Sequence, residues 1–143
     1  MLHTFSGTVS RRCAQGSSEA VAEEMGAAFD RNRFVPYVMM HEFEALLFSD
    51  CAAFAEAIAR PHLREALQEI RDAFASPEEI DDSPNSAPSK RVQALVAGYQ
   101  KPWMGTLAAL AVGLDAMRVA CPHFGRWLSR LEQSPGAAAH AAT

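Results

Sequence analysis

The stretch Phe34-Val-Pro-Tyr-Val-Met-Met-His-Glu-Phe-Glu-Ala-Leu-Leu-Phe48 decides the predicted fold, because an apolar run meets a histidine and two glutamates there. Residues 34–40 are too few to span a membrane and carry β-forming Val and Tyr, so they predict a buried strand. From Phe43 onward, the spacing of Phe43, Leu46 and Leu47 predicts an amphipathic helix. We therefore expect the charged residues at a junction between a strand and a helix.

Glu42 and Glu44 are the candidate metal ligands at this junction, because open α/β sheets bind ligands beyond the carboxyl ends of their strands. If the chain is extended through Glu44, both carboxylates lie on one face and can share Mg²⁺. If a helix begins at His41 instead, Glu44 lies one turn from His41 and is placed to orient its ring for acid–base work. A purely structural explanation is that both acids favour the positive end of a helix. The sequence leaves these alternatives open.

Length and composition predict one domain. The chain has 143 residues, of which 49% are hydrophobic, enough for a core. Its net charge of −4 gives no global basic field of the kind that advertises nucleic-acid binding. Within this length we expect residues 1–16 to form a loose leader, residues 17–133 to form the domain, and the Ala-rich residues 134–143 to be disordered.

The three cysteines are widely spaced and odd in number, and no C-x-x-C pair suggests zinc or a redox site. A reducing cytoplasm is the setting that fits best, with no membrane association. Cys121 and His123 lie two residues apart but lack a third orienting group, so we expect them to cap and pack a helix.

A second candidate site follows a loop at residues 76–89, which contain three prolines and four acids. Lys90 and Arg91 come directly after it, in the first turn of a predicted helix, where cations oppose the helix dipole. Helix amides with these two cations would bind phosphate. Alternatively, the acids of the preceding loop neutralise them.

Three blocks together resemble the bacterial domain-of-unknown-function family 4276: residues 33–48, residues 80–91 and Cys121-Pro-His-Phe-Gly-Arg-Trp127. That family is similar to the TOPRIM-like proteins, which bind magnesium through acidic residues and cleave or join nucleic acid, often beside an ATPase subunit in phage defence. The resemblance implies that Glu44 and Glu42 are metal-associated and that Lys90 contacts phosphate.

The chain departs from the TOPRIM-like pattern in one respect. It contains no Asp-x-Asp and no first-strand pattern before Phe34, and two glutamates are too few for a two-metal site. We therefore expect an α/β family remnant: a C-terminal part, predominantly helical, with one buried strand at about 34–40 packed by roughly five to seven short helices, and inactive alone. The alternative is a non-catalytic module that binds an ATPase subunit, or a homo-oligomer formed through the unpaired strand.

Overall fold

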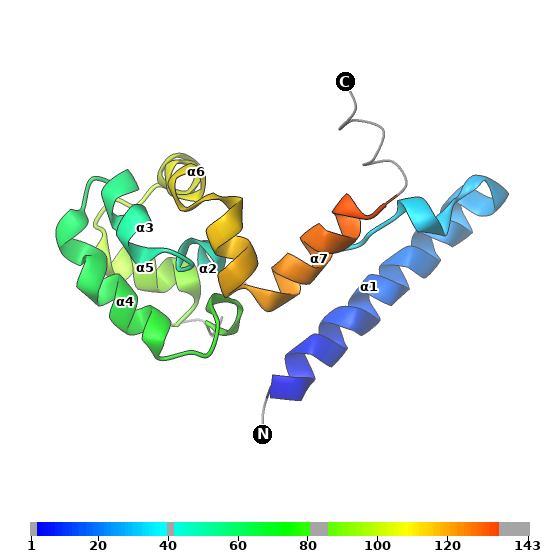
Figure 1. Cartoon of the computed structure of the whole chain (residues 1–143), viewed down its shortest axis with the longest axis horizontal. Coiled ribbons are helices and arrows are strands. Elements are labelled where there is room, and N and C mark those ends of the chain that lie inside the picture. Colours follow the sequence, from blue (N-terminus) through cyan, green and yellow to red (C-terminus); the bar gives the residue numbers. More distant parts are fainter. Residues whose placement is uncertain (1–2, 40–41, 81–85, 135–143) are drawn as a thin grey trace. The chain divides into compact units, whose positions relative to one another are not determined.

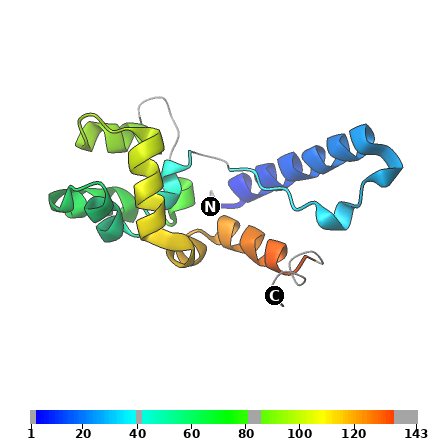
Figure 2. The same cartoon turned by 90° about the horizontal axis from the view of Figure 1, so that it is seen from above.

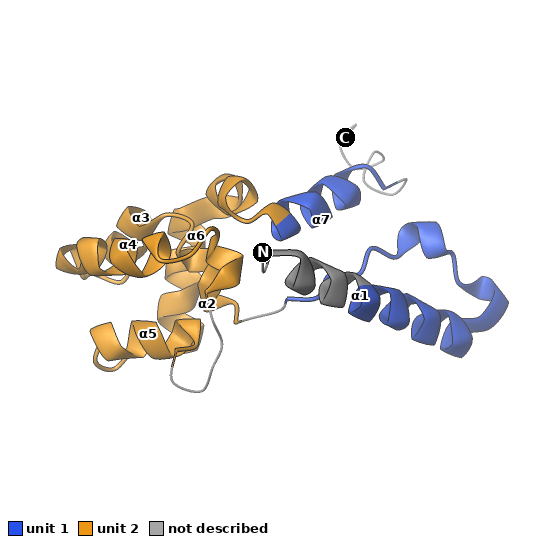
Figure 3. Cartoon of the chain, turned by 90° about the horizontal axis from the view of Figure 1, so that it is seen from below, with its two compact units in different colours: residues 1–40, 123–143 blue, residues 41–122 orange. Residues whose placement is uncertain are grey.

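The computed structural model describes residues 3–39, 42–80 and 86–134. The chain divides into two compact units (Figure 3), which we name by their place in the sequence: the outer unit comprises the two ends of the chain, residues 1–40 and 123–143, and the inner unit comprises the central residues 41–122. Throughout the described residues, the regular structure consists of helices, and no strand is present.

In its described residues, 42–80 and 86–122, the inner unit contains five α-helices and two short 3₁₀ helices; Figure 1 labels the α-helices. In chain order they are α2 (Glu44–Leu47), α3 (Cys51–Ala57), η3 (Pro61–Leu63), α4 (Arg64–Asp72), η4 (Pro77–Glu79), α5 (Pro88–Leu95) and α6 (Lys101–Ala120). Their core includes side chains with no solvent exposure from different segments, among them Leu47, Phe54, Leu67, Ile80 and Val92. Helices α2 to α5 are each too short to be stable alone in water, so this shared burial holds the unit together.

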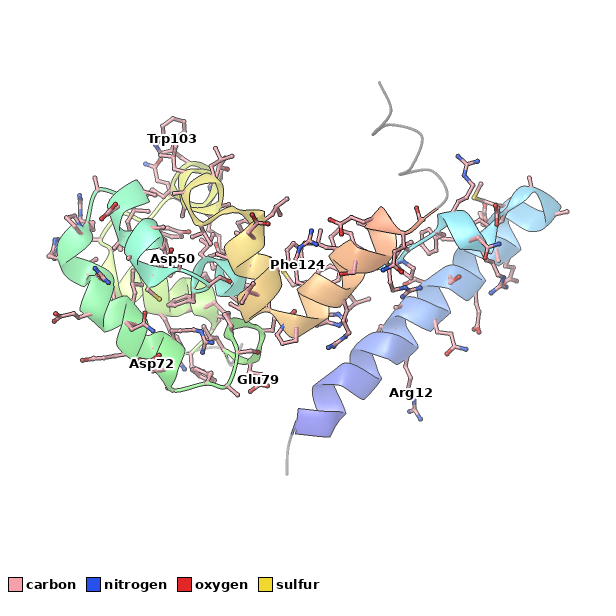
Figure 4. All side chains as sticks on the ribbon, in the orientation of Figure 1. Arg12, Asp50, Asp72, Glu79, Trp103 and Phe124 are labelled. Atoms are coloured by element: carbon pink, nitrogen blue, oxygen red, sulfur yellow. The ribbon has the colours of Figure 1, made fainter. Side chains whose placement is uncertain are left out.

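Local sequence signals explain where the helices of the inner unit begin. The Asp50 carboxylate accepts a hydrogen bond of 2.9 Å from the Ala53 N–H and caps α3, as Ser49-Asp50 predicts. Asp50 is labelled at the start of that helix in Figure 4. Pro88 lies at the start of α5, where its missing N–H costs nothing.

Helix α6 is bent. Gly113 has a φ of 75° and a ψ of 160° inside it, a conformation that side chains with a Cβ rarely adopt. The bend can be followed in Figures 1 and 2.

The outer unit contains α1 (His3–Met25), the 3₁₀ helices η1 (Gly26–Ala28) and η2 (Arg31–Arg33), and α7 (Pro122–Glu132), which begins at the boundary proline. Helix α1 includes most of the residues for which a loose leader is predicted. The tail after residue 134 lies outside the described residues, and the predicted boundaries of the single domain stay a prediction.

The predicted strand is wrong over its described part, residues 34–39; residue 40 lies outside the described residues. The segment is half-buried, and side chains of α7 bind its backbone carbonyls: the Trp127 indole N–H donates to Val35 O at 3.0 Å, and His123 Nε2 lies 3.2 Å from Val38 O. In a flat strand, carbonyls three residues apart point to opposite edges. Here the carbonyls of Val35 and Val38 both meet ring nitrogens of α7, on side chains about one helical turn apart. The α/β fold class therefore has no support in the described residues.

Aromatic packing holds this segment on α7 within the outer unit. The Tyr37 ring stacks on His123 with centroids 5.1 Å apart and lies 4.9 Å from the Trp127 ring. Phe124, labelled in Figure 4, meets the Tyr37 ring edge-on at 5.8 Å. The apolar residues that suggest the core of a sheet thus pack in a cluster of aromatic side chains instead.

Candidate functional site

Glu42 and Glu44 converge on one cation, Lys101, at the start of α6. The Lys101 ammonium lies 3.2 Å from Glu42 Oε1 and 3.4 Å from Glu44 Oε2. The backbone between the two acids is helical rather than extended: Phe43 has φ −53° and ψ −35°, and α2 begins at Glu44. The two carboxylates therefore do not share the face of a strand, yet both reach the same point. His41 lies outside the described residues.

Glu42 has a second partner, at the start of α5. The backbone N–H of Ser89 donates to Glu42 Oε2 at 2.8 Å, so the carboxylate lies at the positive end of that helix. Burial raises the pKa of Glu42, but hydrogen bonds from the Ser89 side chain and N–H, together with Lys101, outweigh it, and the pKa is lowered from its usual 4.5. Glu42 thus links the first turns of α5 and α6 as a carboxylate.

Glu44 is the one charged residue among the buried side chains of the described chain, and only 3% of it is exposed. Burial of an unpaired carboxylate costs roughly several kcal/mol, so buried carboxylates in folded proteins are paired. Its partner here is Lys101, whose side chain is 45% exposed. Burial lowers the pKa of Lys101, but the hydrogen bond to Glu42 and the charges of both glutamates raise it above its usual 10.5. The site is therefore a buried acid closed by a surface ammonium.

Tyr99 adds a hydroxyl beside this cluster. The residue is buried, and its Oη has no hydrogen-bond partner among the described residues. Burial and the negative charge of Glu44 raise the pKa of Tyr99 to about 12, so the hydroxyl keeps its proton at neutral pH. The close backbone at Gly105 encloses it, since a Cβ there would lie 3.3 Å from the Tyr99 oxygen. A protonated donor is thus held near the buried acid.

The predicted phosphate-contacting cations have other partners. Lys90 is exposed, and its ammonium lies 3.5 Å from Gln93 Oε1. Arg91 donates from Nε to Ser86 O at 2.6 Å, and its guanidinium lies 5.3 Å above the centre of the Phe74 ring. Their role in phosphate binding stays a prediction, but the lysine that the fold brings to the glutamates is Lys101.

Lys101 could have been found by the signal that singles out Lys90 and Arg91. It is a cation at the first residue of a helix, directly before Pro102, and it opposes the dipole there unless an acid compensates. The sequence does not say which acid compensates, because Glu42 lies 59 residues away.

The donor set fits one magnesium ion and falls short of two. Mg²⁺ is commonly bound by one or two carboxylates, with waters and substrate phosphates completing its coordination. Glu42 and Glu44 meet that requirement, since both already approach one cation. In the described residues, no group of three or more His, Cys, Asp or Glu side chains could hold a metal ion. A two-metal site would need further carboxylates.

The two cysteines of the inner unit are structural. Cys121 is fully buried, and its sulfur lies 3.3 Å from Ser49 Oγ, while Cys51 Sγ lies 3.7 Å from Phe48 O. Burial raises the pKa of each thiol to about 11. Both thiols are therefore protonated at neutral pH, the form that is the weaker nucleophile.

Comparison with known proteins identifies a family and no individual relative. Residues 7–132 match the model of DUF4276, a domain of unknown function. No curated protein and no solved structure matches the chain. The matched range contains all the residues of the site described above.

Proposed function

The chain belongs to the DUF4276 family, and we propose that it supplies a carboxylate–lysine element to a magnesium-dependent, TOPRIM-like site that cleaves nucleic acid. The observation that carries this proposal is the convergence of Glu42 and Glu44 on one cation at 3.2 and 3.4 Å. A pair of acids that can hold one ammonium is also arranged to approach one divalent ion.

Glu42 and Glu44 would hold the ion, which supplies Lewis acidity and neutralises charge on a phosphate. The chain's own residues provide the orientation. The Ser89 N–H fixes one oxygen of Glu42, so its other oxygen is left to face the cation. Glu44 lies in the first turn of α2 and is only 3% exposed, so the fold sets where its carboxylate lies. Lys101 places a positive charge where an anionic substrate would approach.

This element is incomplete for a two-metal reaction, so we propose that further carboxylates come from outside the described cluster and that the chain alone is inactive. An ATPase partner and a role in bacterial defence rest on the family resemblance alone. The three free thiols support a cytoplasmic setting, in which cysteines stay reduced.

Metal binding and nuclease assays test the proposal together. Electron paramagnetic resonance with Mn²⁺ as the probe should detect one bound ion per chain, and Glu44→Gln should lose it. Glu65→Gln is the matched control, because it makes the same charge change at an exposed position of α4. Absence of a bound ion in the wild-type chain would refute the metal site.

The same preparations should leave supercoiled plasmid and single-stranded DNA uncut in Mg²⁺. Robust cleavage that disappears in Glu44→Gln would support a nuclease and overturn the argument that the element is incomplete.

A second candidate function is a protein-interaction module, and α6 favours it. Large apolar side chains of this helix are exposed, among them Trp103 (65%), Leu110 (77%) and Val119 (85%); Trp103 projects from the helix in Figure 4. The predicted route, pairing through an exposed strand, lacks a strand in the described residues. Sedimentation velocity over a concentration series tests self-association through α6, with Leu110→Ser as the variant. A stable monomer at high concentration would count against it.

A further inference from the structure

Lys101 occupies the position that a metal ion would need. Its ammonium contacts both carboxylates at 3.2 and 3.4 Å. A magnesium ion binds carboxylate oxygens at about 2.1 Å, so it would have to lie between the same two groups. The Lys101 ammonium and a metal ion cannot both occupy that space. Like charges a few ångström apart repel each other, and the repulsion is stronger beside a buried group such as Glu44, where water screens it less.

We propose that Lys101 is an internal competitor for the metal: it neutralises Glu42 and Glu44 while the ion is absent and leaves them when the ion binds. This inference rests on the proposed metal site and adds a regulation of that site. Loading of the ion would then free an ammonium at the edge of the site, where it can meet an anionic group.

The two glutamates differ in how much they depend on Lys101. Glu42 keeps its hydrogen bond from the Ser89 N–H at 2.8 Å after the lysine leaves, so its orientation survives. Glu44 is 3% exposed, and its ion pair is with Lys101. A cation is therefore required at Glu44 in every state, and exchange of an ammonium for a metal ion meets that requirement.

The Lys101 side chain is also free to move away from the two glutamates. Its side chain is 45% exposed, and a lysine carries its charge on a flexible four-carbon stem. It begins α6, so its movement to solvent disturbs no residue before it in that helix. The acids stay in place while the cation between them changes.

Isothermal titration of the whole chain with Mn²⁺ tests the competition. Lys101→Met removes the charge and keeps most of the stem, so it should bind Mn²⁺ at least about tenfold more tightly than the wild type, the effect of removing one nearby like charge. Lys101→Arg keeps the charge and should bind as the wild type does. Lys90→Met is the control, because Lys90 is an exposed lysine that contacts Gln93 instead of the glutamates, and its affinity should stay within about twofold.

Acetylation of the wild-type chain gives a second readout that needs no variant to fold. Saturating Mg²⁺ should speed the modification of Lys101 severalfold, measured by mass spectrometry, and leave the rate at Lys90 unchanged. Equal metal affinities in all variants, with labelling unaffected by Mg²⁺, would overturn the competition and leave the metal site intact. Failure of the wild type to bind an ion would instead remove the proposed function as well.

Discussion

Glu42 joins the starts of α5 and α6, so replacing it should destabilise the inner unit by a predictable amount. Glu42→Ala removes the hydrogen bond from the Ser89 N–H at 2.8 Å and the ion pair with Lys101 at 3.2 Å. A carboxylate on helix N-terminal amides contributes about 1 kcal/mol. The ion pair adds at most about 0.5 kcal/mol, because both side chains are about a third or more exposed. We expect the free energy of unfolding to fall by about 1.5 kcal/mol.

Glu42→Gln separates charge from hydrogen bonding, because the amide oxygen still accepts from Ser89. It should cost about 0.5–1 kcal/mol at pH 7. The pKa of Glu42 is lower in the folded chain than its usual 4.5. Its charge therefore adds stability above about pH 4.5, and that contribution is lost as the pH falls through the folded pKa. The difference between the wild type and Glu42→Gln should shrink in acid.

Urea unfolding followed by far-ultraviolet circular dichroism measures both variants at pH 7 and at a series of lower pH values. Glu65→Ala is the control for loss of an exposed acid on the same unit. The reasoning would be refuted by a Glu42→Ala protein as stable as the wild type at pH 7, or by a Glu42→Gln difference that persists unchanged in acid.

Two further substitutions and one labelling experiment test other parts of the structure. Leu47→Ala should lower the free energy of unfolding by about 2–5 kcal/mol, because the side chain has no exposure, and urea unfolding measures this. Tyr99→Phe should leave stability unchanged or raise it by up to about 1 kcal/mol, because the buried oxygen has no partner; a loss above about 1 kcal/mol would show that the hydroxyl is bonded in solution. Titration with a chromogenic disulfide reagent should modify the exposed Cys13 quickly, and Cys51 and Cys121 only on unfolding, since both are buried with a pKa of about 11.

Local signals in the sequence indicate some of the helix boundaries, because they act over one turn. Asp50 caps α3, Pro122 begins α7, and Gly113 interrupts α6. Each depends on the conformation of one residue or on one hydrogen bond to a near neighbour.

The strand prediction fails because apolar composition does not identify the partner that a segment packs against. Residues 34–39 have the apolar composition of a strand, but a strand needs backbone groups of a neighbouring chain segment. Here Trp127 and His123 bind two of its carbonyls, and Tyr37 joins their rings. Such pairing between distant residues leaves no periodic mark in either segment.

The sequence predicts only part of the candidate site, because it does not specify which distant residues pack together. The sequence identifies Glu42 and Glu44 as an acidic pair next to an apolar helix, and the fold brings them to one point. The choice of Lys101 depends on how α6 lies against α2, and only the packed unit specifies that. Whether these acids bind metal stays a prediction.

The bend at Gly113 has a consequence for membranes. By length and composition, Lys101–Ala120 could cross a bilayer, a property that it shares with core helices of soluble proteins. A crossing needs about 20 residues of continuous helix to span a hydrocarbon core about 30 Å thick. Residues 101–112 and 114–120 are each too short. A membrane-crossing α6 would therefore be a different conformation from the one described, and Gly113 is the residue at which the two would differ.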